Sequence, residues 1–447
     1  MHMVIVRFIR EHKEMEVKEG SLLIRVMRNA GISMETPCGG AGFCGKCKVR
    51  ALQPEALQLA EPLYKFTEAE IAQGMVLACQ ARVYKDVEID TRRAETEEHA
   101  SILSEGDTRT AKVSMKVLRE RDPADFPRGM YGLTVDIGTT TLVCALIDLL
   151  TGEELAAKTA LNPQCVYAQD VVSRIRYTTD EAEGLNVLFT AVSQEINRLL
   201  GLLAEERNIS TGDILAAVYA GNTTMLHLAL HTDPSSLGKY PYTPVITGGL
   251  EVPAREAGIE IHPDAAIYIP PVISSYVGAD ITAGMVAERL DQEKKTTLFI
   301  DIGTNGEMLL ASQGELTATS TAAGPAFEGM NITFGMRASD GAIEYFDLDE
   351  DMRESIRTIK DAPVKGICGS GLFDLVGELV RTGVIEKSGR FVKAEKWTKD
   401  DRIPERLVKY KGKAAYRLPR EVYLTQMDIR QIQLAKSAIR AGIEAML

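Results

Sequence analysis

YGLTVDIGTTTLVCALIDLLTGE, residues 131–153, and TTLFIDIGTNGEMLLASQGEL, residues 296–316, carry the same Asp-Ile-Gly-Thr turn between apolar runs. Each pattern predicts a strand, a tight turn and a second strand. A single hairpin of this kind could equally be a plain structural hairpin or a functional turn. Its repetition, at residues 136–140 and 301–305, indicates a duplicated unit with a shared task.

The residue types in both turns suit a phosphate group and its cation. A glycine lets backbone N–H groups approach phosphate closely, and threonine hydroxyls add further donors. An aspartate at a strand end can hold Mg²⁺ directly or through water, and the sequence leaves open which of the two aspartates is the main holder. Two such turns facing each other would grip a triphosphate from both sides. We therefore expect a triphosphate with Mg²⁺ to contact Asp136, Gly138, Thr139, Thr140, Asp301, Gly303, Thr304 and Asn305, and the family resemblance given below implies that this triphosphate is ATP.

The chain around these turns alternates expected strands and helices, which is typical of α/β layering. Residues 184–206 show helical periodicity, with an apolar stripe opposite charged positions. The paired turns resemble those of the actin, sugar-kinase and Hsp70 superfamily, whose two lobes each offer a phosphate hairpin. The resemblance implies α/β actin-like (RNase H-like) ATPase lobes, the first at 129–212 and the second at 213–447.

A second informative stretch, TPCGGAGFCGKCKVRA at residues 36–51, holds three cysteines among glycines. The ligand pattern is Cys38-x5-Cys44-x2-Cys47, with Cys79 further along the chain. Zinc ribbons usually pair two CxxC knuckles, whereas a plant-type [2Fe–2S] cluster uses this three-plus-one arrangement. Glycines let the loop turn tightly around a cluster and bring N–H groups toward the sulfurs. We expect a [2Fe–2S] cluster here, with zinc as the main alternative.

The surroundings of the cysteine loop fit a ferredoxin. Residues 3–20 predict two strands joined by a turn, and SLLIRVMRNAGI predicts a helix that begins at Ser21 and ends at Gly31. This is the α+β order of a β-grasp ferredoxin domain over residues 1–92, followed by a linker at 93–128. The loop also matches G-x-x-x-x-G-K, but Cys47 stands where a phosphate loop needs Ser or Thr.

Composition excludes several classes of partner. The chain has 447 residues, with 51 basic against 63 acidic side chains and a net charge of −12. Nucleic acid and anionic membrane surfaces are therefore not expected partners. No apolar run is long enough for a membrane span, and the N-terminus does not read as a signal peptide. Seven cysteines, three of them crowded together, favour metal ligation in a reducing compartment, so we expect a cytoplasmic protein.

Together these features resemble the reductive activators of corrinoid-dependent methyltransferase systems. The matching residues are the four cysteines, both Asp-Ile-Gly-Thr turns, NPQ…D…SRI at 162–175, AGNTTM at 220–225 and GICGSGL at 366–372. The resemblance implies ATP-dependent reduction of Co(II) to Co(I) in a corrinoid methyl-carrier protein. Electrons would come from a low-potential donor through the cluster, and a homodimer is an assembly that the resemblance allows. It names no catalytic residue.

Two other function classes remain open from the sequence. One is a ferredoxin-type electron carrier or adaptor fused to a nucleotide-sensing domain without ATP turnover. The other is a small-molecule kinase with a structural zinc loop. The last helix, with Thr425 and Asp428 as a capping box, runs to Leu447 without a stop signal or a later adenosine turn. We therefore expect an incomplete second lobe, which leaves ATP hydrolysis by this chain open.

Two smaller patterns favour structural roles. Asp170 and Arg174 are four residues apart, which favours an ion pair along one helix face over a place in the cleft. His227 and His231 show no metal-ligand spacing, so satisfied structural histidines are expected.

Overall fold

The structure is a computed structural model that describes residues 2–32, 34, 40, 42, 45, 47–60, 64, 66–91, 126, 129–303, 305–329, 331–399 and 401–447. Cys38, Cys44 and Thr304 lie outside the described residues, as does the expected linker apart from Phe126.

The N-terminal region is a mixed sheet with a short helix packed on it. Its elements are β1 (Met3–Phe8), β2 (Lys13–Lys18), β3 (Ser21–Leu22), α1 (Leu23–Asn29), β4 (Lys48–Ala51), β5 (Leu57–Leu59), α2 (Glu68–Ala72), β6 (Met75–Leu77), β7 (Ala81–Val83) and β8 (Val87–Asp90). The main sheet has the order β2-β1-β8-β4-β6, and β3, β7 and β5 form a small second sheet. Alternating apolar residues of β1, such as Val6 and Phe8, are buried with Leu23 and Met27 of α1.

The expected helix start at Ser21 is wrong. Ser21 and Leu22 form β3 and pair with Val83 and Arg82 of β7, so α1 begins at Leu23. Pairing with a distant strand has overridden the local capping preference of serine.

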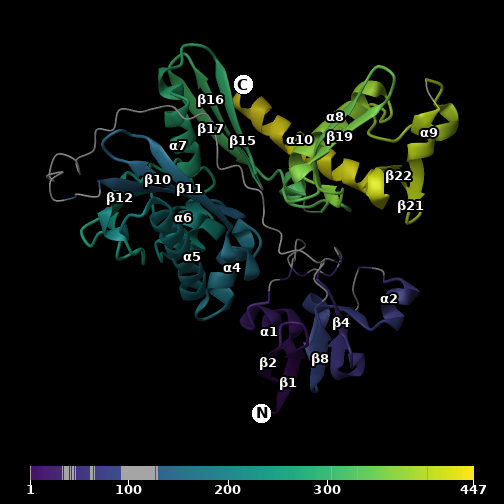
Figure 1. The fold of residues 1–447 in the computed structure, drawn as a ribbon, viewed down its shortest axis with the longest axis horizontal. Helices are drawn as coiled ribbons and strands as arrows, with labels where there is room; N and C mark the ends of the chain where they lie inside the picture. The colour runs from purple at the N-terminus through teal and green to yellow at the C-terminus, as the bar shows by residue number, and fades with distance from the viewer. Residues whose placement is uncertain are drawn as a thin grey trace.

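The next unit is a six-stranded sheet with helices packed on it. Its elements are β9 (Tyr131–Ile137), β10 (Thr141–Asp148), β11 (Glu154–Leu161), α4 (Val171–Asp180), α5 (Gly184–Arg207), β12 (Ile214–Gly221), α6 (Thr223–Ala229), β13 (Leu250–Pro253), β14 (Ala266–Ile269) and α7 (Ala279–Ala287). The strand order is β11-β10-β9-β12-β14-β13. Buried residues of α4, α5 and α6 share one core with β9, β10 and β12, and these helices lie together beside the sheet in Figure 1.

This sheet order favours a division between the lobes other than the expected one. β12 pairs in parallel with β9 along its full length, and β14 pairs with β12. A boundary after residue 212 would therefore divide a single sheet and its core. We propose instead that the first lobe extends from 129 to about residue 293, before β15 begins.

The C-terminal unit consists of three small sheets arranged along one long helix. Its elements are β15 (Thr297–Ile302), β16 (Gly306–Ser312), β17 (Glu315–Thr321), β18 (Ala342–Leu348), β19 (Glu354–Thr358), β20 (Gly366–Ile367), α8 (Gly369–Thr382), α9 (Arg402–Arg406), β21 (Leu407–Tyr410), β22 (Lys413–Arg417), β23 (Tyr423–Thr425) and α10 (Gln426–Met446). Figure 1 shows α10 running from the sheet β21–β23 to the sheet β15–β17. Ile429 and Ile432 pack in the core near α8, while Gly442 lies against Met308 of β16.

The capping box predicted for the last helix is confirmed. Thr425 accepts a hydrogen bond from the Asp428 backbone N–H, and the Asp428 carboxylate accepts one from the Thr425 N–H. Asp428 also accepts a hydrogen bond from the Thr333 backbone N–H at 2.8 Å, which ties the helix start to a distant loop.

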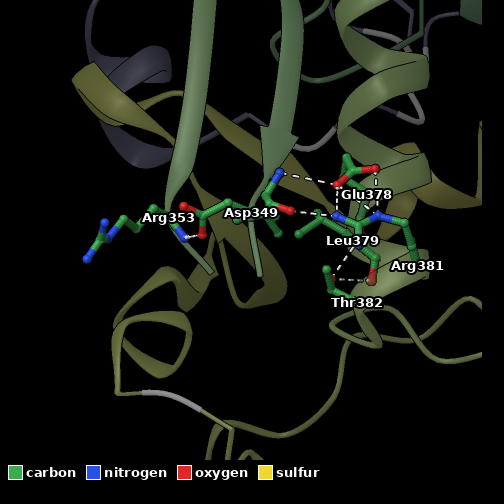
Figure 2. Close-up of polar contacts among 7 residues, drawn as sticks. Asp349, Arg353, Glu378, Leu379, Arg381 and Thr382 are labelled. Carbon is green, nitrogen blue, oxygen red and sulfur yellow. Dashed lines mark hydrogen bonds and ion pairs between the residues drawn. The ribbon is translucent and has the colours of Figure 1, made fainter. Parts of the chain in front are cut away.

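The turn between β18 and β19 is fastened to α8, as Figure 2 shows. The Glu378 carboxylate accepts a hydrogen bond from the Leu348 N–H at 3.2 Å and one from Arg381 Nε at 2.9 Å. Asp349 accepts a hydrogen bond from the Arg353 N–H at 2.8 Å, closing the turn. These contacts hold α8 in place, and its first residues reach the site described below.

No helix in the described part of the chain combines the length and the apolar character needed to cross a membrane.

Candidate functional site

The two Asp-Ile-Gly-Thr turns face one cavity of about 1200 Å³ between the lobes. The first lobe contributes Asp136 from β9 and the turn at 138–140, and the second contributes Asp301 from β15 with Gly303 and Asn305. All the predicted nucleotide-binding residues that the structure describes therefore line the same cavity. A volume of this size accommodates a nucleotide triphosphate.

Strand pairing sets the shape of both turns. Ile137 of β9 pairs with Leu142 of β10, and Ile302 of β15 pairs with Gly306 of β16. The Gly303 N–H donates a 3.0 Å hydrogen bond to the Asn305 carbonyl. The last strand pair before each turn therefore fixes where the turn begins and ends. The turn residues between these pairs line the cavity.

The first turn is held from behind by polar side chains of the motif NPQ…D…SRI. Asn162 Nδ2 donates to the Gly138 carbonyl at 2.8 Å, and an amine of the Arg174 guanidinium donates to the Thr139 carbonyl. The other Arg174 amine donates to Gln164 Oε1 at 2.9 Å. These bonds occupy the turn's carbonyl oxygens from the side away from the cavity, which favours presentation of its N–H groups to an anion.

The ion pair expected between Asp170 and Arg174 is not the role that the structure gives to these residues. Asp170 is the N-cap of α4 and accepts a hydrogen bond from the Ser173 N–H at 2.8 Å. Arg174 is fully buried and also donates from Nε to the Ala168 carbonyl at 3.1 Å. The helix therefore directs the guanidinium inward to the phosphate turn, because each of its donors finds an oxygen or sulfur partner there.

Desolvation dominates the pKa shifts of four of the carboxylic acids that line the cavity, Asp136, Asp280, Asp301 and Glu307. Burial raises the pKa of Asp136 to about 6, with repulsion from Asp301 adding to the effect. Burial also raises the pKa of Asp280 to about 7 and that of Glu307 to about 8, and the pKa of Asp301 is raised for the same reason. Neighbouring carboxylates contribute to the shifts of Asp280 and Glu307. Such a group of acids favours a bound cation, which would remove both the desolvation and the repulsion.

Within the described ranges, no three histidine, cysteine or acidic side chains converge closely enough to hold a metal ion by themselves. Mg²⁺ commonly keeps several waters and takes only one or two carboxylates together with substrate phosphates. The donor set at the cavity therefore fits Mg²⁺ carried by a nucleotide better than a permanently bound metal.

The acids come from elements that approach closely. Asn222, the N-cap of α6, donates from Nδ2 to Glu307 Oε1 at 3.2 Å and so links β12 to β16. Asp280 lies in the first turn of α7, two residues after the N-cap Gly278. A Cβ on Gly278 would lie 2.5 Å from the Gly221 carbonyl oxygen, so only glycine lets α7 approach the end of β12 this closely.

The wall opposite the first turn comes from the second lobe. Thr140 Oγ1 donates a 2.8 Å hydrogen bond to Glu328 Oε2, joining the two sides of the cavity. The segment Cys368–Ser370 at the start of α8 lines the same cavity, with Phe327 and Met336 as apolar neighbours. GICGSGL is thus both the tight strand–helix junction favoured by the sequence and part of the cavity wall.

The cysteine loop brings together the two predicted ligands that the structure describes. Cys47 and Cys79 are buried, and their sulfur atoms lie 3.2 Å apart. The hydrogen bond from Cys47, together with the backbone N–H of Gly42, lowers the pKa of Cys79 to about 7. Two adjacent buried sulfurs with a lowered pKa fit thiolate ligation of an iron–sulfur cluster.

Tyr64 covers this loop. A Cβ on Gly45 would lie 2.3 Å from the Tyr64 ring, and Gly45 has a φ of +71°, so glycine is required on both counts. The Tyr64 hydroxyl accepts a 3.0 Å hydrogen bond from Lys48 Nζ, and Lys48 also pairs with Glu70 at 2.6 Å. The aromatic ring is thereby fixed over the cluster loop.

Comparison with known proteins places this geometry in context. Residues 8–84 match the model of a 2Fe-2S iron-sulfur cluster binding domain. Residues 131–293 match the RACo middle region, and residues 295–447 match the C-terminal domain of RACo, the ASKHA domain. A solved structure described as a reductive activator for corrinoid, iron-sulfur protein is 33% identical, with a TM-score of 0.64. The match covers 99% of this chain and 83% of that one.

The chain belongs to the family of corrinoid reductive activators. A corrinoid activation enzyme, RamQ, from Eubacterium limosum is 28% identical over 96% of this chain and 81% of its own length. A [Co(II) methylated amine-specific corrinoid protein] reductase from Methanosarcina barkeri is 29% identical over 70% of this chain and 58% of its own length. The ferredoxin-like and actin-like fold classes predicted from the sequence are confirmed by these matches.

Sequence reasoning missed several residues of the cavity in this family member. Asp280 and Glu307 line it, although neither belongs to the Asp-Ile-Gly-Thr turns. Glu307 lies two residues after Asn305, so the repeated turn itself carried a signal for it. Asp280 comes from α7, and only the tertiary fold brings it to the site.

His227 plays the structural role that was expected. It is fully buried, its Nδ1 donates to the Thr223 carbonyl at 2.7 Å, and its Nε2 accepts hydrogen bonds from the Val245 and Ile246 N–H groups. Burial lowers the pKa of His227, consistent with a neutral ring that both donates and accepts.

Proposed function

We propose that this chain reductively activates a corrinoid protein, using ATP to assist transfer of an electron from a [2Fe–2S] cluster to Co(II). The observation that carries the proposal is the presence, in one chain, of an acid-lined cleft between paired phosphate turns and a loop with adjacent buried cysteine sulfurs. The membership of the corrinoid activator family supports the same reaction.

The cluster would be held by Cys38, Cys44, Cys47 and Cys79. When bound, a [2Fe–2S] cluster supplies one electron at a low potential, near −400 mV for plant-type centres. The electron balance is simple: a low-potential donor loses one electron, and Co(II) of the corrinoid substrate gains it and becomes Co(I). Buried sulfurs and the Gly42 N–H at Cys79 are the features by which the chain would tune this potential.

The nucleotide would be ATP with Mg²⁺, bound between the lobes. The two turns line the cavity and would bind the phosphates through their N–H groups, and Asp136 and Asp301 stand at the strand ends where a cation would neutralise them. Thr140 and Glu328 join the two walls, so a nucleotide that contacts both turns favours one spacing of the lobes. ATP can assist the uphill reduction only by binding two states of the activator complex with different free energies.

Anaerobic optical spectroscopy tests the proposal. The cluster-loaded chain, reduced with dithionite, is mixed with a Co(II) corrinoid methyl-carrier protein, with and without Mg-ATP. Cys47→Ser removes a cluster ligand, and Cys144→Ala removes a buried thiol of β10 as the matched control. We expect Co(I) absorbance that requires Mg-ATP and is lost only in Cys47→Ser.

A different outcome has a definite meaning. Reduction of the cluster with the cobalt remaining Co(II) in the presence of Mg-ATP would favour the carrier or adaptor alternative. Iron and sulfide analysis of the same sample separates the activator and the carrier, which both contain the cluster, from a kinase with a zinc loop, which would contain neither iron nor sulfide.

The remaining components of the proposal are a cytoplasmic location, a separate low-potential electron donor and assembly as a homodimer. Sedimentation velocity on the holo-chain measures the assembly directly.

A further inference from the structure

Helix α4 extends from the phosphate turn of the first lobe toward the cluster domain. Near its start, Arg174 donates to the Thr139 carbonyl of the turn and to Gln164 Oε1 at 2.9 Å. At its other end, Glu181 is the C-cap residue. Seven residues of helix place these two side chains about 10 Å apart along the axis.

The cluster domain contacts this far end. Arg25 of α1 pairs with Glu181, with Nη2 and Oε1 3.2 Å apart, although the two side chains remain 58% and 36% exposed. Figure 1 shows α1 beside the lower end of α4. The contact therefore joins the cluster domain to the helix that supports the phosphate turn.

A second arginine on α1, Arg28, interacts electrostatically with residues of both α4 and the cluster site. Arg28 is half-buried, and burial lowers its pKa, while the ionised forms of Tyr177, Cys47 and Cys79 act in the opposite direction. Arg28 is thus within electrostatic reach of both α4 and the cysteines. Reduction of a cluster at those cysteines adds one negative charge near it.

The helix between the two ends is well packed. Val171 and Ile175 are buried in the core of the first lobe, and the Arg174 guanidinium is fully buried. Packed interiors transmit small displacements instead of absorbing them. A shift of Thr139 on nucleotide binding would therefore move α4 as a unit.

We propose that the C-terminal end of α4 is the docking surface for the cluster domain of the same chain, and that Arg25 and Glu181 there couple nucleotide affinity to the redox state of the cluster. This inference rests on the proposed function, because it takes ATP and a [2Fe–2S] cluster as the two ligands. By thermodynamic linkage, a cluster whose reduction changes nucleotide affinity must have a potential that responds to nucleotide by the same factor.

The test measures nucleotide affinity in two redox states. The dissociation constant of Mg²⁺ with a non-hydrolysable ATP analogue is determined anaerobically for the full holo-chain, oxidised and then reduced with dithionite. We expect the two constants to differ by a ratio of about two to five, the range that an exposed ion pair can supply. The same ratio should appear as a nucleotide-induced shift in the cluster potential in an EPR-monitored titration.

Three variants assign the effect to the surface. Glu181→Lys should bring the ratio to one while leaving the cluster spectrum unchanged. Asp180→Lys is the matched control, because Asp180 is an exposed acid on the same helix that pairs with Arg176 of its own helix, at 3.1 Å. The double exchange of Arg25→Glu with Glu181→Lys should restore the wild-type ratio.

Two results would overturn the coupling: a wild-type ratio of one, or a ratio that survives in Glu181→Lys as it does in Asp180→Lys. Failure of the proposed function itself looks different, since the oxidised wild-type chain would then not bind the nucleotide analogue at all.

Discussion

Thr140 Oγ1 lies 2.8 Å from Glu328 Oε2, a hydrogen bond between residues 188 positions apart that joins the two walls of the cavity. Thr140 belongs to the first phosphate turn, whereas Glu328 follows β17, the third strand of the sheet that carries the second turn. The spacing of the two walls is therefore linked to the residue that would contact a phosphate.

The substitution Thr140→Val removes this bond while keeping the shape of the side chain. We expect nucleotide affinity to fall by about tenfold, because a hydrogen bond to a charged group contributes roughly 1.5 kcal/mol or more. Isothermal titration calorimetry with Mg²⁺ and an ATP analogue measures the change. Thr134→Val, on the exposed side of β9, is the control and should leave the affinity unchanged; equal affinities in all three chains would contradict the prediction.

The cavity acids whose pKa is raised make stability depend on pH. A carboxyl whose pKa is raised in the folded state binds its proton more tightly there than in the unfolded chain, so stability falls as pH rises between the two values. For Asp280, this window runs from its ordinary value near 4 to about 7. We expect Asp280→Asn, in EDTA, to match the wild-type melting temperature near pH 4.

Above pH 7 the same variant should melt higher than the wild type by at least about 2–4 °C, the shift that ~1 kcal/mol produces in a domain of this size. Asp291→Asn, at an exposed position, should show no such divergence. If the melting temperatures of wild type and Asp280→Asn change with pH in parallel, the pKa of Asp280 is not raised in the folded state. Adding Mg-ATP should reduce the difference, because the cation neutralises the site.

Removal of the buried Arg174 guanidinium should lower the free energy of unfolding of the first lobe. Arg174→Met leaves the carbonyls of Thr139 and Ala168 without this donor, and unpaired buried groups cost about 1–3 kcal/mol each. We expect a loss of about 3 kcal/mol in urea denaturation. Arg176→Met alters the neighbouring arginine, which is 79% exposed, and should change stability by less than about 0.5 kcal/mol.

The cluster loop should be sensitive to a single methyl group. Gly45→Ala places a Cβ against the Tyr64 ring and should lower the iron and sulfide content after anaerobic reconstitution. Gly249→Ala has a similar φ, +68° against +71°, with no atom near its Cβ, so it separates backbone strain from the clash. If the clash is the cause, adding Tyr64→Ala to Gly45→Ala should recover much of the cluster; an unaltered iron content in Gly45→Ala would contradict the prediction.

The sequence alone was sufficient to predict the ferredoxin-like and actin-like folds, because each prediction rests on local patterns, the cysteine spacing and the repeated Asp-Ile-Gly-Thr turns. The repeated turns identified one wall of each lobe, and α5 at Gly184–Arg207 agrees with the predicted periodicity. The boundary predicted after residue 212 takes no account of the return of β12 to the first sheet after a long helix, because that return is a property of strand order and not of local pattern.

The direction in which a side chain points was the other feature that the sequence could not predict. The spacing of Asp170 and Arg174 predicted a pair on the helix surface, yet burial of α4 turned the arginine inward to carbonyl oxygens. Asp280 carries no local signal, since it becomes a cavity residue only through the packing of α7. Periodicity indicates which face of a helix is apolar. It does not indicate which backbone atoms, distant in sequence, that face contacts in the folded protein.

The bonds from Asn162 and Arg174 to the back of the first phosphate turn have a thermodynamic consequence. The turn is ordered when the lobe folds, so a nucleotide need not immobilise it. Association should therefore carry little conformational entropy penalty at this hairpin, whose backbone should be equally well ordered in the empty and occupied states. A rearrangement on binding would then displace parts that are already ordered, the turn with α4 behind it and the two lobes, and would not include an ordering of the turn.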